Sequence, residues 1–151
     1  VDMSATLIHH GHIRLLKKAA ELGDVVVALT SDTEVKSKKG YTPELNFAER
    51  KEILEAVKYV TEVVESPWLI TEDFVNEHHC DLLVHGSDNV NHIDPKRLVI
   101  FPRTEGVSSS TLRERVLDCL IEMNVTGKSG SASEKPTRFM IKAIKKEFRL
   151  E

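Results

Sequence analysis

Apolar positions along the chain switch between helical and strand spacing. From residue 11 to residue 22, apolar side chains recur at positions 13, 15, 16, 19, 20 and 22, which is the spacing of one helix face, and Gly23 follows as a stop. The run DVVVALT, residues 24–30, is short, β-branched and continuous, as in a strand buried on both faces of a parallel sheet. We therefore expect a helix followed by a buried strand.

The same alternation continues toward the end of the chain. The stretch 31–45 is polar and basic and contains Gly and Pro, so we predict a loop there. Asn46 followed by Glu49 resembles a capping box that opens a helix through about residue 57. The remaining predicted elements are strands at 59–65 (YVTEVVE), 81–86 (DLLVHG) and 97–101 (RLVIF), helices at 71–79 and 109–123, and the tail of a strand at residues 1–3.

Strands that alternate with helices imply βαβ units with right-handed crossovers. The expected fold class is α/β, with a Rossmann-like, doubly wound parallel sheet. Ligands of such sheets bind outside the carboxyl ends of the strands. Three polar segments, HHGH, HGSDN and PRTEGVSSS, follow predicted apolar segments at that edge. A ligand site is expected where they meet.

The texture of the chain changes after residue 124. We predict one domain at 1–124, a flexible, low-complexity linker at 125–136 and an amphipathic helix at 137–151. Met140, Ile144 and Phe148 lie on one face of that helix, surrounded by basic residues. Such a helix can bind a membrane surface, but packing against the domain or a dimer mate is favoured.

Composition excludes several classes of protein. A chain of 151 residues with 40% hydrophobic residues fits one globular domain. A net charge of −3 does not indicate a nucleic-acid-binding protein. No stretch approaches the roughly 18 consecutive apolar residues of a membrane span. The two cysteines, Cys80 and Cys119, are far apart, and the chain opens on VDMSA without a signal-peptide pattern. A cytoplasmic protein is expected.

The densest polar cluster is HHGH, residues 9–12, at the start of the first helix. Gly11 allows a ligand to approach the backbone, and the N-terminus of a helix favours anions. His9 and His12 are therefore candidate N–H donors to one phosphate, although polar turn and capping residues explain them as well. A zinc site is disfavoured, because His78, His79 and Cys80 are adjacent on a predicted helix and diverge.

The second cluster is RTEGVSSS, residues 103–110, before the last predicted helix. Arg103 offers a planar fork for phosphate, and Gly106 allows close approach. Three serine hydroxyls lead into another helix N-terminus. A serine-rich turn alone is usually a helix cap. Its pairing with HHGH in a doubly wound fold argues against a chance occurrence.

The pair of motifs H-x-G-H and R-T-x-G-[IV]-S-[ST]-[ST], about a hundred residues apart, resembles the cytidylyltransferases that act on glycerol 3-phosphate, phosphocholine and phosphoethanolamine. Both motifs are intact, at residues 9–12 and 103–110. The resemblance extends from residue 2 to about residue 116 and implies the nucleotidyltransferase fold. It implies an enzyme that transfers CMP from CTP to a small phosphorylated acceptor and releases pyrophosphate.

The resemblance also implies roles for individual residues. His9 and His12 are expected to hold the CTP phosphates and stabilise the transition state, and Lys39 to bridge the phosphates of both substrates, with Lys36 and Lys38 as competing assignments. Magnesium is expected on the triphosphate, held by phosphate oxygens and water without a protein ligand. The expected nucleotide-binding residues are Gly11, Asp88, Arg103, Thr104, Gly106, Ser108, Ser109 and Ser110.

The acceptor is the finer question. Asp2, seven residues before His9, and Trp68 match the positions at which choline-type relatives hold an amine, and a carboxylate beside an aromatic face suits an ammonium group. Thr6 stands where relatives usually carry aspartate. Phosphoethanolamine or 2-aminoethylphosphonate is favoured over phosphocholine. The alternatives are glycerol 3-phosphate or another polyol phosphate, and a non-catalytic nucleotide-binding module. A homodimer is expected from the resemblance.

Overall fold

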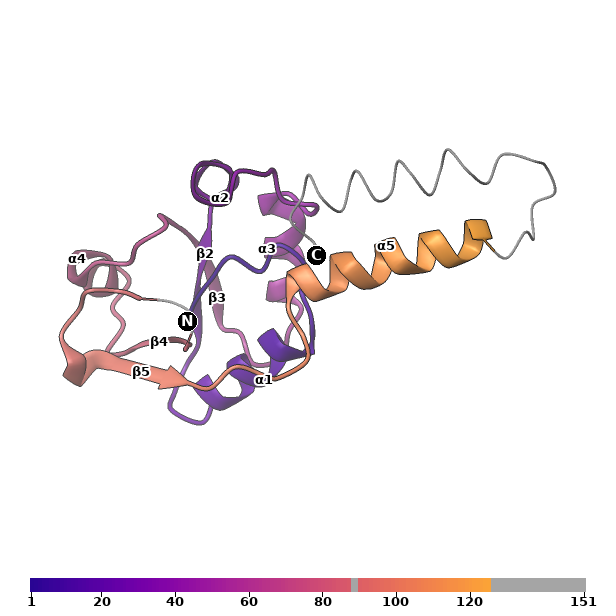
Figure 1. Ribbon diagram of the computed structural model, residues 1–151. Helices are drawn as coiled ribbons and strands as arrows, with labels where there is room; N and C mark the ends of the chain where they lie inside the picture. The colour runs from indigo at the N-terminus through magenta and orange to yellow at the C-terminus, as the bar shows by residue number, and fades with distance from the viewer. Residues whose placement is uncertain (88–89, 126–151) are drawn as a thin grey trace. The chain divides into compact units, whose positions relative to one another are not determined.

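The computed structural model describes residues 1–87 and 90–125, without the side chains of 121–125. The chain divides into two compact units, Val1–Val107 and Ser108–Glu151. The described part of the first unit has five strands, and the described part of the second is one helix (Figure 1). The strands are β1 (Asp2–Met3), β2 (Val26–Thr30), β3 (Glu62–Ser66), β4 (Leu83–Gly86) and β5 (Leu98–Phe101).

All strand pairs are parallel. β2 lies between β1 and β3, and β4 pairs with β5. β1 and β4 are in contact, which brings the two small sheets together. Ala28 of β2 is in register with Asp2 on one side and Val64 on the other. The predicted doubly wound α/β fold is confirmed.

Helices cover both faces of these strands. The first unit contains α1 (His10–Ala19), α2 (Asp32–Lys39), α3 (Phe47–Glu55), α4 (Glu72–Glu77) and the 3-10 helix η1 (Pro95–Arg97), and the second contains α5 (Ser109–Val125). Figure 1 shows α1 and α3 on one side of β2 and β3, and α4 on the other. Two hydrophobic clusters correspond to these faces, one containing Leu16 and Leu54, the other containing Val75.

The prediction of a loop over 31–45 is wrong for its first part, which forms α2. Ser31 caps this helix by accepting from the backbone N–H of Glu34 (3.3 Å), and Gly40 ends it with a left-handed φ of 76°. Lysines in the last turn complement the helix dipole. Val35 is its only buried residue, so the segment has no apolar stripe that periodicity could detect.

Arg50 on α3 is completely buried and ties the carboxyl ends of β1 and β2 to α3. Its guanidinium donates to the carbonyl oxygens of Ser4, Thr30 (3.0 Å) and Leu45 (3.1 Å), and pairs with Oδ1 of Asp32 at 2.6 Å. Oδ2 of Asp32 accepts from the backbone N–H of Phe47 (2.9 Å). This network fixes the edge of the sheet at which the ligand site was predicted.

Some predictions lie outside the described residues. These are the role of Asp88, the linker from residue 126 onward and the helix at 137–151. The boundary predicted at residue 124 falls one residue before the end of α5. Within the described residues, no helix is long and apolar enough to cross a membrane.

Candidate active site

His9 and His12 together build the start of α1. His9 is the N-cap residue, and its Nδ1 accepts from the backbone N–H of Gly11 at 3.1 Å. His12, at the third helical position, accepts the backbone N–H of His9 on its Nδ1 at 3.2 Å. The rings lie against each other with centroids 3.9 Å apart. The two histidines therefore form a capping box, in which they take the places of Ser or Thr and of Glu or Gln.

This arrangement decides which nitrogen carries the proton. Because each Nδ1 accepts a hydrogen bond, the proton of each neutral ring must lie on Nε2. Both histidines cap the helix through Nδ1, which accepts a hydrogen bond. The Nε2–H donor of each ring takes no part in the cap. The sequence predicts that both residues donate to an anion, and the structure shows that Nε2 is the nitrogen of each neutral ring that can donate.

The environment keeps the two rings neutral. Burial lowers the pKa of His12 to about 3, assisted by the nearby charges of His9, Lys39 and Arg103. Burial also lowers the pKa of His9, with smaller contributions from His10 and Arg103. These shifts show that Arg103 and Lys39, far apart in sequence, lie close enough to His12 to act on it. Their positive charges also suit an anionic ligand.

Gly11 is required by close packing. A Cβ added there would lie 2.9 Å from Cε1 and Nδ1 of His9 and 3.3 Å from Cγ1 of Val107. Real Cβ atoms essentially never show the shorter contact, so a larger residue would push the His9 ring away. The contact with Val107 also shows that the segment after β5 lies against the start of α1. The structure therefore brings the first motif and the Arg103–Val107 part of the second motif together.

The rest of the second motif belongs to the second unit. The hydroxyl of Ser108 accepts from the backbone N–H of Thr111 (3.0 Å) and lies 2.9 Å from the Thr111 hydroxyl. Ser108 therefore caps α5, and Ser109 and Ser110 are in its first turn. In the first unit, Thr104 is half-buried and Gly106 lies in the turn after β5. Their proposed contacts with nucleotide stay predictions.

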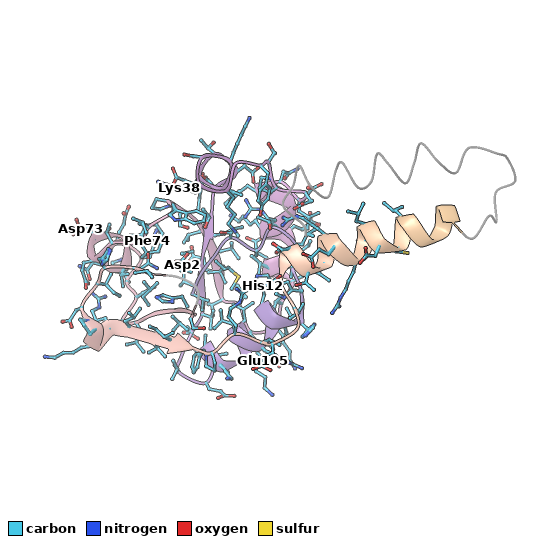
Figure 2. The ribbon with its side chains drawn as sticks, viewed as in Figure 1. Asp2, His12, Lys38, Asp73, Phe74 and Glu105 are labelled. Carbon is cyan, nitrogen blue, oxygen red and sulfur yellow. The ribbon has the colours of Figure 1, made fainter. Side chains whose placement is uncertain are left out.

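Asp2, one of the predicted acceptor residues, is joined through Asn91 to the backbone of Ile70. Asp2 is buried, and its Oδ2 accepts from Nδ2 of Asn91 at 2.8 Å. Oδ1 of Asn91 accepts from the backbone N–H of Ile70 at 2.8 Å, two residues after Trp68. Asn91 was not predicted as a partner of Asp2, because the two residues are 89 positions apart in the sequence. In Figure 2, Asp2 lies in the middle of the first unit, whereas Asp73 lies to one side on α4.

The three candidate lysines differ in their surroundings. Lys36, Lys38 and Lys39 are all exposed in the last turns of α2. The Nζ of Lys39 lies 5.6 Å from the ring centroid of Trp68, and its charge acts on His12. Lys39 thus lies near both Trp68 and His12, and its bridging of two substrates stays a prediction. Thr6, the remaining acceptor candidate, is buried just before α1.

Two buried polar atoms lack a hydrogen-bond partner among the described residues, Oγ of Ser66 and Nε2 of His85. They lie at the carboxyl-terminal parts of β3 and β4. Nδ1 of His85 lies 2.8 Å from the carbonyl oxygen of Gly86, so it donates there and leaves Nε2 as an acceptor. The signal in the sequence was a histidine inside an apolar strand. A buried, unpaired acceptor at this edge suits a ligand donor.

Metal-ligating residues do not gather at this site. Among residues 1–87 and 90–125, no group of three or more His, Cys, Asp and Glu side chains could hold a metal ion. The groups that meet at the start of α1 are N–H donors and cations, which bind anions.

We expect His12 to stay neutral throughout the physiological range in the ligand-free protein. With its pKa lowered to about 3, its Cε1–H resonance should not titrate between about pH 5 and 8. The unfolded chain takes up this proton near 6.5, so the stabilisation that neutral His12 provides is present above that pH and is lost as the pH falls toward 3. NMR titration, with His12→Ala to assign the signal, tests this. An inflection near pH 6.5 would contradict it.

Comparison with known proteins agrees with this geometry. A sequence model of the family described as cytidylyltransferase-like matches residues 5–115. The chain is 36% identical over 145 residues to the ethanolamine-phosphate cytidylyltransferase of Dictyostelium discoideum, covering 87% of this chain and 40% of that protein. It is 36% identical over 118 residues to the glycerol-3-phosphate cytidylyltransferase of Bacillus subtilis (strain 168), covering 73% of this chain and 89% of that protein.

A solved structure shares the fold. The lipopolysaccharide core biosynthesis protein from Thermoplasma volcanium GSS1 superposes with a TM-score of 0.59 at 19% identity, over 69% of this chain and 94% of that one. The family match covers well over half of the chain and contains the whole of the first motif. The chain therefore belongs to the cytidylyltransferase-like family.

Proposed function

We propose that the protein transfers CMP from CTP to a small phosphorylated or phosphonate acceptor and releases pyrophosphate. The observation that carries this proposal is the pair of neutral histidines at the start of α1, each with an Nε2–H donor, beside Arg103 and Lys39. Uncharged donors and cationic side chains around a helix N-terminus suit a triphosphate whose charge is redistributed during reaction. The family to which the chain belongs supports the same reaction.

The chemistry needs positioning and charge stabilisation only. An oxygen of the acceptor phosphate or phosphonate attacks the α-phosphorus of CTP, and the bond to the oxygen bridging the α- and β-phosphates breaks. Pyrophosphate leaves with that electron pair. His9 and His12 donate to the phosphate oxygens, and Arg103 and Lys39 balance the charge that develops. Magnesium would enter as part of the MgCTP substrate, held by phosphate oxygens and water.

For the acceptor we propose an amine, either phosphoethanolamine or 2-aminoethylphosphonate. Asn91 joins the buried carboxylate of Asp2 to the backbone of Ile70, two residues after Trp68, which supports a shared role for the negative charge and the aromatic ring. Both groups attract an ammonium ion. The relative from Dictyostelium, named for ethanolamine phosphate, supports this choice.

Glycerol 3-phosphate is the second candidate acceptor. The relative from Bacillus subtilis named for it has the same identity, 36%, and the chain covers 89% of that protein. A module that binds CTP without turnover is the third reading, and pyrophosphate release from CTP distinguishes it from both enzymes. A homodimer is a further proposal from the family resemblance, and sedimentation equilibrium tests it.

The acceptor proposal is tested with Asp2→Asn, which removes the charge and keeps an oxygen for Asn91. We expect the KM for phosphoethanolamine to rise about tenfold or more, because one charge-assisted contact with the ammonium is lost. The KM for CTP should not change. The KM for propyl phosphate, in which a methyl group replaces the ammonium, should not change either.

Asp73→Asn is the matched control, because Asp73 is exposed on α4 (Figure 2). It should leave all three constants unaltered. Equal losses for phosphoethanolamine and propyl phosphate in Asp2→Asn would contradict an amine site at Asp2. Faster turnover of glycerol 3-phosphate than of either amine in the unaltered protein would favour the second candidate.

A further inference from the structure

The ammonium group of Lys39 lies near two parts of the site, the ring of Trp68 and the start of α1. Its Nζ lies 5.6 Å from the ring centroid of Trp68, within the range of a cation–π contact. Its charge is also felt by His12 at the start of α1. Lys39 is the last residue of α2 and is followed by Gly40 in a left-handed conformation, so its long side chain projects from a helix end. The ammonium can therefore serve either the tryptophan or the phosphates.

Trp68 is anchored to α2 through its backbone, whereas Lys39 is exposed. The backbone N–H of Trp68 donates to Oε2 of Glu34 on α2 at 3.1 Å, which fixes the tryptophan relative to the helix that carries Lys39. Its ring is half-buried, and the lysine is exposed. Two ammonium groups cannot share one ring face, because both are attracted to the same negative region and repel each other.

We propose that Lys39 occupies, in the acceptor-free protein, the face of Trp68 that receives the ammonium group of the acceptor. An amine-bearing acceptor displaces Lys39 toward the phosphates, whereas a neutral acceptor leaves it on the ring. This inference rests on the proposed function and adds a consequence: the amine contributes to catalysis as well as to binding. Selectivity for amines then arises in kcat and not only in KM.

Three substitutions test the exchange, with phosphoethanolamine and its neutral isostere propyl phosphate as acceptors. In the unaltered protein, kcat should be about 2- to 5-fold higher with phosphoethanolamine, the range expected for one exposed cation–π contact. Trp68→Leu releases Lys39 without an amine, so kcat with propyl phosphate should rise by about the same factor. A gain in rate after loss of the aromatic ring is not expected from a merely structural role.

Lys39→Gln provides an independent readout at an exposed position. It should lower kcat with both acceptors, but the KM of propyl phosphate divided by that of phosphoethanolamine should increase about 2- to 5-fold, because the competing cation is gone. In the double variant Lys39→Gln/Trp68→Leu this increase should disappear. General repulsion between Lys39 and the amine does not depend on the tryptophan ring. If the increase in the KM ratio persisted in the double variant, the proposed exchange would therefore be overturned.

Lys18→Gln is the matched control, since Lys18 makes a contact of the same kind with Phe101 at 5.3 Å. It should alter neither kcat nor the KM ratio. Trp68 is the only tryptophan of the chain, so its emission also reports the exchange directly. Phosphoethanolamine should alter that emission in the unaltered protein, and propyl phosphate should alter it much less.

The outcomes separate the two levels of the proposal. Formation of the CDP adduct of ethanolamine with an unchanged KM ratio in Lys39→Gln would overturn the exchange and leave the proposed function intact. Failure to form a CDP adduct with any acceptor would overturn both.

Discussion

His12→Ala should lower kcat for CMP transfer by about 10²- to 10³-fold, the loss typical of removing one preorganised donor to a transition state. The variant loses the Nε2–H donor and also the acceptor for the backbone N–H of His9. Initial rates of pyrophosphate release at saturating CTP and acceptor measure the effect. His10, the exposed neighbour, is the control, and His10→Ala should stay within about threefold of the unaltered rate.

A second substitution separates the helix cap from the catalytic donor. Glutamate at this position is the residue of an ordinary capping box, so His12→Glu should preserve the start of α1 and the thermal stability. Its carboxylate would face the triphosphate and should reduce kcat at least as much as alanine does. If His12→Glu retained near-normal turnover, the role assigned to the Nε2–H donor would be wrong.

Arg50→Met should reduce the free energy of unfolding by about 3–5 kcal/mol, as expected when one partner of a buried ion pair is removed. The substitution leaves three carbonyl oxygens, those of Ser4, Thr30 and Leu45, without their donor. It also removes the charge opposite Asp32. Chemical unfolding followed by circular dichroism measures the loss.

The next residue on α3 supplies the control for this stability test. Lys51 pairs with Glu55 at 3.7 Å, with both side chains exposed. Surface pairs of this kind contribute little, so Lys51→Met should change the free energy of unfolding by less than about 1 kcal/mol. A similarly small effect for Arg50→Met would show that the buried network does not hold the sheet edge together.

Part of the fold could be predicted from the sequence because β2 and β3 lie in runs rich in β-branched residues. Residues 24–30 and 59–65 contain β2 and most of β3, and Asn46 with Glu49 forms the predicted capping box of α3. The sequence pattern did not predict α2, because this helix buries Val35 alone and is stabilised by its caps and charges. Periodicity detects a buried face, and this helix has almost none.

The site was predicted less completely than the fold. The motifs located His9, His12 and Arg103, since their residue types and spacing are recognisable in the sequence. The proton on Nε2 follows only from backbone donors that meet each Nδ1, which no sequence pattern displays. The partnership of Asp2 with Asn91 depends on tertiary contact across most of the chain.

The central claim is that this site joins CMP to an amine-bearing phosphate or phosphonate. Phosphorus NMR of the protein incubated with MgCTP and either phosphoethanolamine or 2-aminoethylphosphonate tests it most directly. The account predicts a new phosphoanhydride signal pair for the CDP-type product, together with stoichiometric pyrophosphate, and neither signal with His12→Ala on the same time scale. Unchanged CTP with both acceptors, or pyrophosphate accompanied only by free CMP, would contradict the account.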